Sequence, residues 1–303
     1  MSNPRPLTKW VGGKTNAAPA IIEAIEEIDG FGGEDTPYCE PFAGGGGLFV
    51  AAMNRGMLDG KEVVLGDANV PLMVAWGAVS TTQGAHHVAD LMLGIERDYA
   101  ALPQEVTKGS KRRAFYNSQR QRLNSGDGLH TEQAARLLWL VQHGFNGLYR
   151  ESKSGNMNTP WNKDQCSDTA VDSAADNLVL LAETIRDRGI RLTAHAGDYY
   201  PCVHRVRGAR AIIYADPPYL KTDFVQYQAD GFTPLNHAQL QALGHVVEVT
   251  HGHRMWVSNM DSPSARQLYA PNYIVDIEDK VSVNRDPAGR GVRRDILVRI
   301  GGW

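Results

Sequence analysis

The sequence has few cysteines, no excess of positive charge and no long hydrophobic run. Its 303 residues include three cysteines, Cys39, Cys166 and Cys202, with no CxxC spacing. An odd count without paired spacing argues against a disulfide framework and is typical of a reducing cytoplasm. The formal net charge of -3 excludes a uniformly basic coat of the kind that binds nucleic acid without specificity, so any such binding must depend on local patches.

Neither a secretion signal nor a membrane segment is indicated. The chain starts Met-Ser-Asn-Pro-Arg-Pro-Leu-Thr-Lys-Trp, which lacks the apolar core of a signal peptide. Nowhere do about 18 apolar residues follow one another, the length that a membrane helix needs. We therefore expect a soluble, cytoplasmic protein without a membrane partner. A chain of 303 residues fits either one large α/β domain with an insertion or two separate domains.

The most informative segment is Ile212–Tyr219, which reads Ile-Ile-Tyr-Ala-Asp-Pro-Pro-Tyr. Its apolar half predicts a buried parallel strand, which the prolines end because they lack the N–H group that ladder pairing needs. Asp216 is thus placed at the carboxyl end of a strand, where open α/β sheets bind ligands. We expect the stiff Pro217-Pro218 turn to leave backbone carbonyls unpaired and pointing outward. The resulting acceptor cluster suits an amine attached to a ring on which Tyr219 stacks, although an ordinary strand-to-loop exit is the alternative.

A βαβ unit is predicted near the N-terminus. The expected elements are a strand at Thr36–Glu40, a glycine loop at Pro41–Gly47, a helix at Leu48–Arg55 closed by Gly56, and a strand at Glu62–Gly66 ending at Asp67. Two strands joined in this way require a right-handed crossover and a parallel sheet. The sequence therefore favours an α/β fold.

The glycine loop and Asp67 favour an adenosyl group as ligand. Gly44–Gly47 brings a backbone without side chains between a strand and a helix N-terminus, which indicates that something bulky lies there. Asp67 ends the next strand, as does the acid that hydrogen-bonds a ribose in Rossmann folds. A nicotinamide dinucleotide is disfavoured because Phe49 occupies the neighbourhood where pyrophosphate needs a glycine. A purely structural glycine turn is the other alternative.

Two further motifs fail on their context. Gly12-Gly13-Lys14-Thr15 ends like a phosphate loop, but Thr8 stands where the pattern needs a glycine, and hardly any chain precedes it to form a strand. Lys14 is either a contact for a ligand carboxylate or a lone surface lysine. Pro201-Cys202 has the form of the cytosine carbon-5 methyltransferase nucleophile. However, Asp216 before two prolines implies direct attack by an amine, which excludes a thiolate adduct at the same site.

The region from about Val74 to Cys166 has helical periodicity and looks inserted. The pattern is clearest at Thr131–His143, where four apolar residues share one face: Ala134, Leu137, Leu138 and Val141. Strand signals then resume. The remaining expected elements are strands at Ile190–Ala196, Ile212–Ala215 and Met255–Ser258, a helix opened by Thr233-Pro234 with Leu240, Leu243, Val246 and Val247 inward, a short helix opened by Ser262-Pro263, and an antiparallel pair at Tyr273–Ile277 and Val292–Ile300.

A hairpin is predicted directly after the inserted helix. Asn146-Gly147 between bulky residues signals a hairpin turn. Phe145 is placed to wedge between bases, and Arg150 is placed to read guanine with two hydrogen bonds. Leu148 or Pro160 would contact a thymine methyl group. The alternative is a plain structural hairpin.

Five motifs, in this order, resemble those of the Dam-type DNA adenine-N6 methyltransferases. They are Lys9-Trp10-Val-Gly-Gly-Lys14, Glu40-Pro-Phe-Ala-Gly-Gly-Gly46, Leu65-Gly-Asp67-Ala-Asn69, Asn146-Gly-Leu-Tyr-Arg150 and Asp216-Pro-Pro-Tyr219. The resemblance spans nearly the whole chain. It implies a Rossmann-like seven-stranded methyltransferase sheet at residues 1–75 and 167–303, and a mainly helical target-recognition insertion at residues 76–166.

The resemblance also implies a chemistry and a set of site residues. S-adenosylmethionine would be the methyl donor, duplex DNA the substrate, and no metal is expected. The implied catalytic residues, which would grip an adenine flipped out of the duplex, are Asp216, Pro217, Pro218 and Tyr219. The implied cofactor contacts are Trp10, Lys14, Glu40, Phe42, Gly44, Gly46, Asp67, Asp198, Tyr199 and Asp216. The implied DNA contacts are Phe145, Asn146, Leu148, Arg150, Asn158 and Pro160.

The resemblance leaves several alternatives open. GATC is the expected recognition sequence because the hairpin matches at Arg150 and Pro160, whereas Tyr149 and Glu151 depart from the pattern. A cytosine-N4 methyltransferase would share the acid-Pro-Pro-aromatic site. A glutamine or RNA methyltransferase would have no use for the inserted hairpin, and a non-catalytic DNA-binding module would leave Asp67 unexplained. We expect a monomer, with a cognate restriction enzyme as a possible partner.

Overall fold

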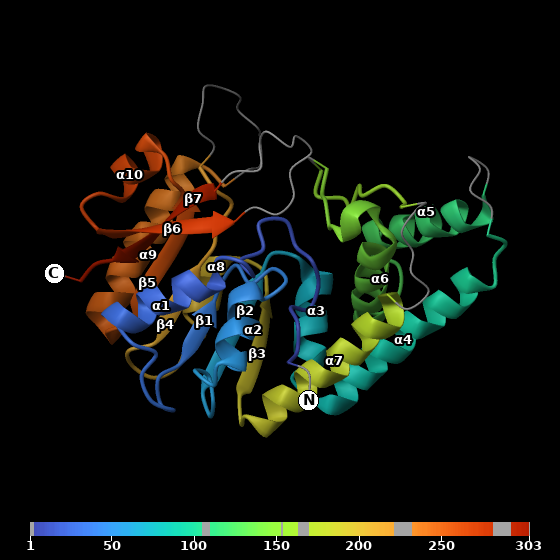
Figure 1. Ribbon diagram of the computed structural model, residues 1–303, viewed down its shortest axis with the longest axis horizontal. Helices are drawn as coiled ribbons and strands as arrows, with labels where there is room; N and C mark the ends of the chain where they lie inside the picture. Colours follow the sequence, from blue (N-terminus) through green and yellow to red (C-terminus); the bar gives the residue numbers. More distant parts are fainter. Residues whose placement is uncertain are drawn as a thin grey trace. The chain divides into compact units, whose positions relative to one another are not determined.

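The computed structural model describes residues 3–104, 110–152, 154–162, 170–220, 232–280 and 292–302. It contains a seven-stranded sheet in the order β3-β2-β1-β4-β5-β7-β6 (Figure 1). The strands are β1 (Tyr38–Glu40), β2 (Glu62–Asp67), β3 (Arg191–Ala196), β4 (Ile212–Ala215), β5 (Arg254–Met260), β6 (Tyr273–Lys280) and β7 (Val292–Ile300). Strands β2, β1, β4 and β5 pair in parallel, and β7 runs antiparallel to both β5 and β6. The predicted Rossmann-like methyltransferase sheet is therefore confirmed.

Several of the helices begin at a residue whose side chain caps them. Within the described residues they are α1 (Ala18–Ile28), α2 (Gly47–Asn54), α3 (Val70–Ala78), α4 (Thr82–Ala100), α5 (Lys111–Asn124), α6 (His130–His143), the 3-10 turn η1 (Phe145–Gly147), α7 (Ala170–Asp187), α8 (Tyr199–Val203), α9 (Pro234–His251) and α10 (Pro263–Tyr269). Asn69, Thr81 and Ser262 each accept a backbone N–H in the first turn of the helix that follows. None of the helices within the described ranges is both long and apolar enough to cross a membrane.

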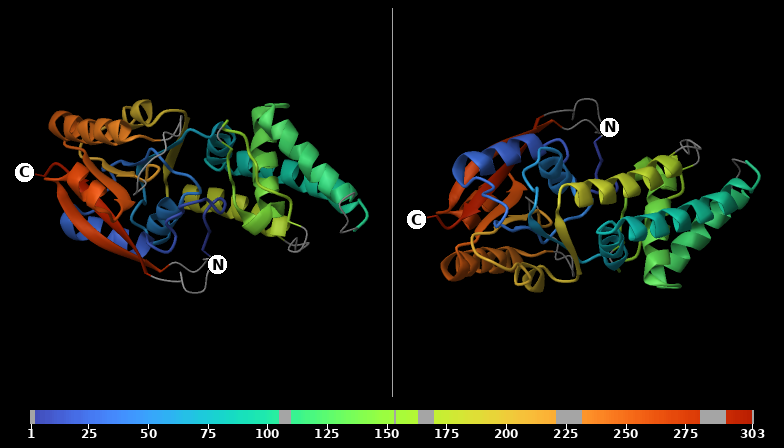
Figure 2. Two further views of the ribbon diagram at one scale, coloured as in Figure 1. Left: turned by 90° about the horizontal axis from the view of Figure 1, so that it is seen from above. Right: turned by 90° about the horizontal axis from the view of Figure 1, so that it is seen from below.

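Two compact units make up the chain. The first comprises Met1–Gly13, Gly44–Gly46 and Asn69–Ala196. In it, α4 and α7 lie side by side (Figure 2), and α6 packs against both α3 and α4. The insertion expected at residues 76–166 stays a prediction; its helices α4, α5 and α6 all belong to this unit.

The second unit comprises Lys14–Ala43, Gly47–Ala68 and Gly197–Trp303. It holds every strand except β3, with α1 on one face of the sheet and α9 on the other (Figure 2). The core between β4, β5, β7 and α9 is apolar and includes Ile213, Val257, Leu243 and Val298. Cys39 and Cys202 are buried free thiols here, and Cys166 lies outside the described residues.

The predicted helix after Thr233 is confirmed, with one error in its inward face. Thr233 caps α9 through a reciprocal pair with Asn236, and Gly252 ends the helix with a φ of 69°. Leu240, Leu243 and Val247 are buried as expected. Val246 is 54% exposed, because consecutive helical residues point about 100° apart and only one of two neighbours can face the sheet.

Helices α1 and α7 and the short α8 were not predicted. Helix α1 starts beside Pro19 and buries Ile21, Ile22 and Ile25. Helix α7 buries Leu178, Leu181, Ala182 and Ile185. Both carry the i, i+3, i+4 pattern of an amphipathic helix, so the signal was present in the sequence.

The predicted hairpin exists, but its turn does not lie at Asn146-Gly147. These residues have φ values of 60° and 63°, the left-handed conformation that Asn-Gly favours, yet they form η1 within one arm. The paired positions are Gly144 with Trp161 and Glu151 with Met157. The chain therefore reverses between Ser152 and Asn156, where the Ser152 N–H donates to the Asn156 carbonyl at 2.8 Å.

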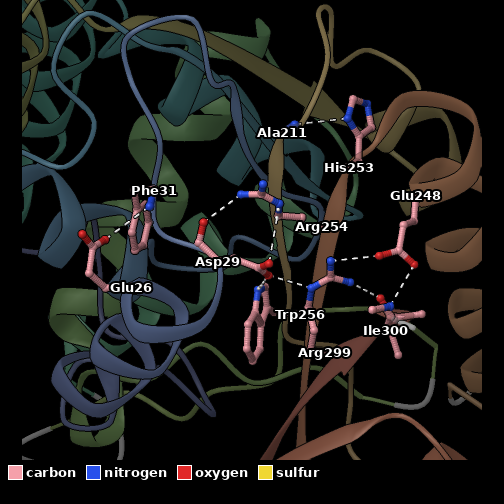
Figure 3. A network of polar contacts seen from close by, with 11 residues as sticks. Glu26, Asp29, Phe31, Ala211, Glu248, His253, Arg254, Trp256, Arg299 and Ile300 are labelled. Atoms are coloured by element: carbon pink, nitrogen blue, oxygen red, sulfur yellow. Dashed lines mark hydrogen bonds and ion pairs between the residues drawn. The ribbon is translucent and has the colours of Figure 1, made fainter.

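A closed network of charges joins α1, β5, β7 and α9 in the second unit (Figure 3). The Asp29 carboxylate lies 2.6 Å from Arg299 Nε, 2.9 Å from Trp256 Nε1 and 3.5 Å from Arg254 Nε. Arg299 also donates to Glu248 at 2.9 Å. The Asp29 and Glu248 carboxylates thus each accept hydrogen bonds from positively charged or N–H donors. Pairing of this kind offsets the free-energy cost of removing a charge from water.

Candidate functional site

Asp216 directly follows β4 and pairs with a lysine that lies far from it in the sequence. Its Oδ2 is 2.9 Å from Lys14 Nζ, which also lies 4.7 Å from the centroid of the Tyr219 ring. Lys14 is 6% exposed, so it is not a surface lysine. The structure therefore brings together three of the predicted site residues at the carboxyl end of a parallel strand, where α/β sheets bind ligands.

Tyr219 is held at both ends. Its hydroxyl donates to Asp295 Oδ2 at 2.8 Å, while its ring lies under Lys14. Burial, and then the negative charge of Asp216, raise the pKa of Tyr219, so the side chain remains a neutral phenol. Asp295 lies in β7, 76 residues away along the chain, and no local motif marks it. A fixed aromatic ring beside a carboxylate is suited to a planar ligand that carries an amine.

The Pro217-Pro218 turn differs from expectation. The Pro218 carbonyl is not unpaired, because it accepts a hydrogen bond from His237 Nε2 at 3.1 Å. The next N–H group, of Leu220, donates to Asn259 Oδ1 at 3.2 Å. For the Pro218 carbonyl the expectation was wrong, because its partner is a side chain of α9, and only the ladder partners can be inferred from strand pairing.

Glu40, at the end of β1, is a buried carboxyl group. It is 2% exposed and accepts a hydrogen bond from the Tyr38 hydroxyl at 2.7 Å. Burial raises the pKa of Glu40 to about 8, assisted by the charge of Asp216 and opposed by the Tyr38 hydrogen bond. The parallel pairing of β1 with β4 explains why these two carboxyl groups lie near each other. A bound cation here would favour the charged form of Glu40.

The loops after β1, β2 and β3 gather further predicted residues. The Ala43 N–H donates to the Gly66 carbonyl at 2.7 Å, and the Gly197 N–H donates to the Asp67 carbonyl at 2.9 Å. These bonds place Phe42 beside Tyr199, with ring centroids 5.3 Å apart. Asp198 caps α8 through the Tyr200 N–H. Phe232, which the sequence analysis did not select, packs edge-on against both rings.

This group of residues fits an adenosyl ligand. Phe42 and Tyr199 are half-buried aromatic side chains that offer π surface to a purine, and Asp67 is half-buried at the end of β2. In Rossmann folds an acid at this place in the fold accepts from ribose hydroxyls. Glu40 adds a buried carboxyl group that suits a positively charged ligand. The residue types and their position at the strand ends therefore satisfy what S-adenosylmethionine requires.

The glycine loop packs against tryptophans. A Cβ atom at Gly44 would lie 2.7 Å from Trp10 Cδ1, and one at Gly46 would lie 2.3 Å from Trp76 Cζ2. Both glycines also have positive φ, 49° and 74°. Trp76 Nε1 donates to the Gly44 carbonyl at 2.9 Å. The bulky groups at these two positions in the first unit are thus the protein's own Trp10 and Trp76.

The hairpin is fixed to the N-terminal segment and to α5. Tyr149 stacks on Trp10, with ring centroids 4.6 Å apart and planes 5° apart. Asn124 of α5 makes two hydrogen bonds with the backbone of Met157, at 3.0 and 2.8 Å. Arg120 donates to the Thr159 carbonyl at 2.8 Å. The hairpin is therefore a supported structure rather than an isolated loop.

The predicted DNA contacts lie mostly on the exposed side of this hairpin. Exposed side chains are those of Phe145, Asn146, Arg150, Asn158 and Pro160, and Leu148 is half-buried. Phe145 is 39% exposed, so its ring is accessible on the surface of the hairpin. The backbone of Arg150 is held by Thr159 Oγ1 at 3.1 Å, so a guanidinium group extends from a fixed point.

Comparisons with known proteins match nearly the whole chain to one family. Residues 10–283 match the family model described as D12 class N6 adenine-specific DNA methyltransferase. The Type II methyltransferase M1.LlaDCHI of Lactococcus lactis subsp. cremoris is 24% identical over 98% of this chain and 95% of its own length. The DNA adenine methylase of Vibrio cholerae serotype O1 is 25% identical over 98% and 96%, and that of Serratia marcescens 23% over 98% and 98%.

Five motifs carry the resemblance. The family match covers four of them completely, and it covers the first, Lys9–Lys14, from Trp10 onward. It also covers Glu40, Lys14 and Asp216, which the fold of the second unit brings to one end of its sheet. The chain therefore belongs to the D12 class N6 adenine-specific DNA methyltransferase family.

Proposed function

We propose that the chain transfers a methyl group from S-adenosylmethionine to the exocyclic N6 of an adenine flipped out of duplex DNA. The observation that carries the proposal is the position of Asp216. It is a half-buried carboxylate at the end of β4, beside the Tyr219 ring and the Lys14 ammonium, in a chain of this family. An acceptor fixed beside an aromatic surface is what an amine on a planar base requires.

The residues act mainly by position and electrostatics. Asp216 and the Pro217 carbonyl accept the two N–H protons of the adenine amine, which favours the pyramidal nitrogen that attacks. Tyr219 stacks on the flipped base, and its hydroxyl bond to Asp295 keeps the ring from turning. The proton lost by nitrogen passes to Asp216 or to water. Oriented acceptors of this kind contribute about 10²- to 10³-fold each to a rate.

S-adenosylmethionine would supply an electrophilic methyl group on a positively charged sulfur. Phe42 and Tyr199 would hold its adenine, Asp67 its ribose, and Glu40 its positive charge. Lys14 and Trp10 remain proposed contacts, with Lys14 positioned by Asp216. Because Glu40 has a pKa raised to about 8, binding of a cation beside it near neutral pH would release a proton.

The hairpin is the proposed reader of DNA sequence. Phe145 would wedge between bases to offset the few kcal/mol that unstacking costs. Arg150 would bind the N7 and O6 atoms of guanine, and Leu148 or Pro160 would contact a thymine methyl group. Asn146 and Asn158 are exposed amides that can reach base edges or phosphates. GATC is the proposed site.

The test uses duplexes that contain reactive adenines only or reactive cytosines only, with a labelled methyl donor. Label is expected in the adenine duplex and lost when GATC is changed. Label in the cytosine duplex would support N4 methylation, and label in neither, with no donor binding by calorimetry, would support a non-catalytic module. Arg150→Ala should weaken discrimination at the guanine by about 1–3 kcal/mol, with wild-type protein as the reference.

A further inference from the structure

The segment after β4 needs support that the sheet cannot give. Pro217 and Pro218 have no N–H group, so neither can donate a backbone hydrogen bond. Yet Asp216 and Tyr219, on either side of them, are the residues that must hold a substrate in a fixed place. Something other than strand pairing must therefore fix this stretch of backbone.

His237 provides the first support. It lies in α9, is fully buried, and its Nε2 is 3.1 Å from the Pro218 carbonyl oxygen. A carbonyl only accepts, so Nε2 carries the proton. The Nδ1 atom lies 2.8 Å from the Tyr269 hydroxyl, which therefore donates to it. Burial lowers the pKa of His237 to about 4, so the ring is neutral near pH 7 and this single tautomer satisfies both neighbours.

Asn259 and Tyr269 provide two further contacts that hold this backbone segment and the His237 ring. Asn259, near the end of β5, accepts the Leu220 N–H with its Oδ1 at 3.2 Å. Burial raises the pKa of the Tyr269 hydroxyl, so this side chain stays a neutral phenol that can donate to His237. The Asn259 Nδ2 atom itself makes no hydrogen bond of normal geometry within the described residues. Both side chains are fully buried.

We propose that His237, Tyr269 and Asn259 form a clamp that positions the backbone of residues 216–220 for methyl transfer. His237 holds the Pro218 carbonyl, Tyr269 fixes the His237 ring, and Asn259 holds the Leu220 N–H. None of the three is a catalytic residue in this scheme. The inference rests on the proposed function, because it assigns these residues a role in that same site.

The chain offers a matched control in His253. This histidine is also buried, its pKa is also lowered to about 4 by burial, and it also binds backbone of the β4 region. Its Nδ1 accepts the Ala211 N–H at 3.2 Å, just before β4 begins rather than after it ends (Figure 3). A buried histidine that also hydrogen-bonds the backbone, here as the acceptor, therefore exists at the end of β4 that carries no chemistry.

The test compares single-turnover methyl transfer and donor affinity in His237→Leu, His237→Gln, Tyr269→Phe and His253→Gln. His237→Leu should lower kcat about 10- to 100-fold, as expected for a small misplacement of reacting groups, with the Kd for S-adenosylmethionine nearly unchanged. His237→Gln places an amide N–H near the former Nε2 and should recover most of the rate. Tyr269→Phe should give a smaller loss, and His253→Gln none.

A second measurement is independent of catalysis. Hydrogen exchange of the Leu220 amide reports whether the segment after β4 is held, and ¹⁵N spectra of the histidines report the tautomer. The clamp predicts a protected Leu220 amide and an Nε2-protonated His237 in the wild type, with faster exchange in His237→Leu. These readouts apply even if no methylated adenine is found, in which case the proposed function fails while the clamp is still tested.

The outcomes that overturn the clamp are specific. Wild-type kcat in a folded His237→Leu variant would show that the bond to Pro218 does not position the site. If His237→Leu and His253→Gln lost equal amounts of activity, in proportion to their loss of folded protein, His237 would only stabilise the fold. A failure of His237→Gln to recover rate would contradict the hydrogen bond as the cause, and an unprotected Leu220 amide in the wild type would contradict the clamp directly.

Discussion

The two ends of the sheet in the second unit both hold acids that are buried or half-buried, but the surroundings of these acids differ. Where β5 begins, both oxygens of Asp29 face nitrogen donors from Arg254, Trp256 and Arg299. Where β1 and β4 end, Glu40 lies beside a second carboxyl group, Asp216, and its pKa is raised to about 8. At one end the carboxylate charge is matched by donors, while at the other end the surroundings of Glu40 disfavour its charged form.

This difference indicates which end of the sheet contributes to stability and which contributes to function. Charges matched on every side leave nothing for a ligand to improve, so they contribute to the folded state alone. Perturbed acids next to an aromatic ring are typical of sites that gain from binding a charged or polar ligand. Substitutions at the two ends should therefore separate stability from activity.

The largest effect is expected from Asp216→Asn. The amide turns an acceptor that faces the substrate amine into a partial donor, so the methyl-transfer rate should fall about 10³-fold. An oxygen remains for Lys14, so the free energy of unfolding should change by less than about 2 kcal/mol. Single-turnover rates and calorimetric donor binding measure both effects. Normal turnover by this variant would remove Asp216 from the site.

Asp29→Asn should produce the reverse outcome. Both Asp29 oxygens face donors, so the new NH₂ group must oppose one of them, and Arg299 loses its charged partner. We expect the free energy of unfolding to fall by about 3 kcal/mol. Denaturant titration measures this loss. The methyl-transfer rate per folded molecule should stay within about twofold of wild type, and a larger fall would show that the two ends are coupled.

Glu40→Gln should alter how stability depends on pH. The pKa of Glu40 is raised in the folded protein from an ordinary value of 4.5 to about 8, so the folded state binds the proton more tightly than the unfolded state. Wild-type stability should therefore decline as pH rises from about 4.5 to about 8, a loss that glutamine avoids. Since one pKa unit corresponds to about 1.4 kcal/mol, the variant should be more stable by about 5 kcal/mol at pH 9 and nearly equal at pH 4. A constant difference from pH 4 to pH 9 would contradict the raised pKa.

The smallest effect is expected from Tyr214→Phe, between the two ends. The Tyr214 hydroxyl shares a hydrogen bond of 2.7 Å with Ser258 in the buried middle of β4 and β5. Loss of that bond should lower the free energy of unfolding by about 1 kcal/mol. Thermal melts at two pH values check this, with Ser258→Ala as the partner variant. If Tyr214→Phe lowered the methyl-transfer rate more than Asp29→Asn does, the active site would include the middle of β4.

The sequence was sufficient to place residues whose position depends only on their neighbours along the chain. Asp216 could be placed at a strand end because apolar residues precede it and two prolines follow, and β4 occupies Ile212–Ala215 as predicted. It was insufficient where partners come from distant elements. His237 and Asp295 touch the motif across 19 and 76 residues, and no periodicity encodes such a contact.

The misplaced features have similar physical causes. Asn146-Gly147 has the left-handed backbone that the dipeptide favours, but pairing of Gly144 with Trp161 decides where the hairpin turns. Lys14 had two possible environments until the fold placed Asp216 at 2.9 Å from it. The need for glycine at positions 44 and 46 was visible, whereas the identity of the neighbours, Trp10 and Trp76, was not.

The most direct test compares the two aspartates in one assay. Single-turnover methyl transfer to a duplex with adenine as its only reactive base is measured for wild type, Asp216→Asn and Asp29→Asn, at a temperature where all three are folded. We expect N6-methyladenine from wild type and Asp29→Asn at rates within about twofold, and a rate about 10³-fold lower for Asp216→Asn. Equal rates for the two variants, or methyl transfer by Asp216→Asn at the wild-type rate, would contradict it.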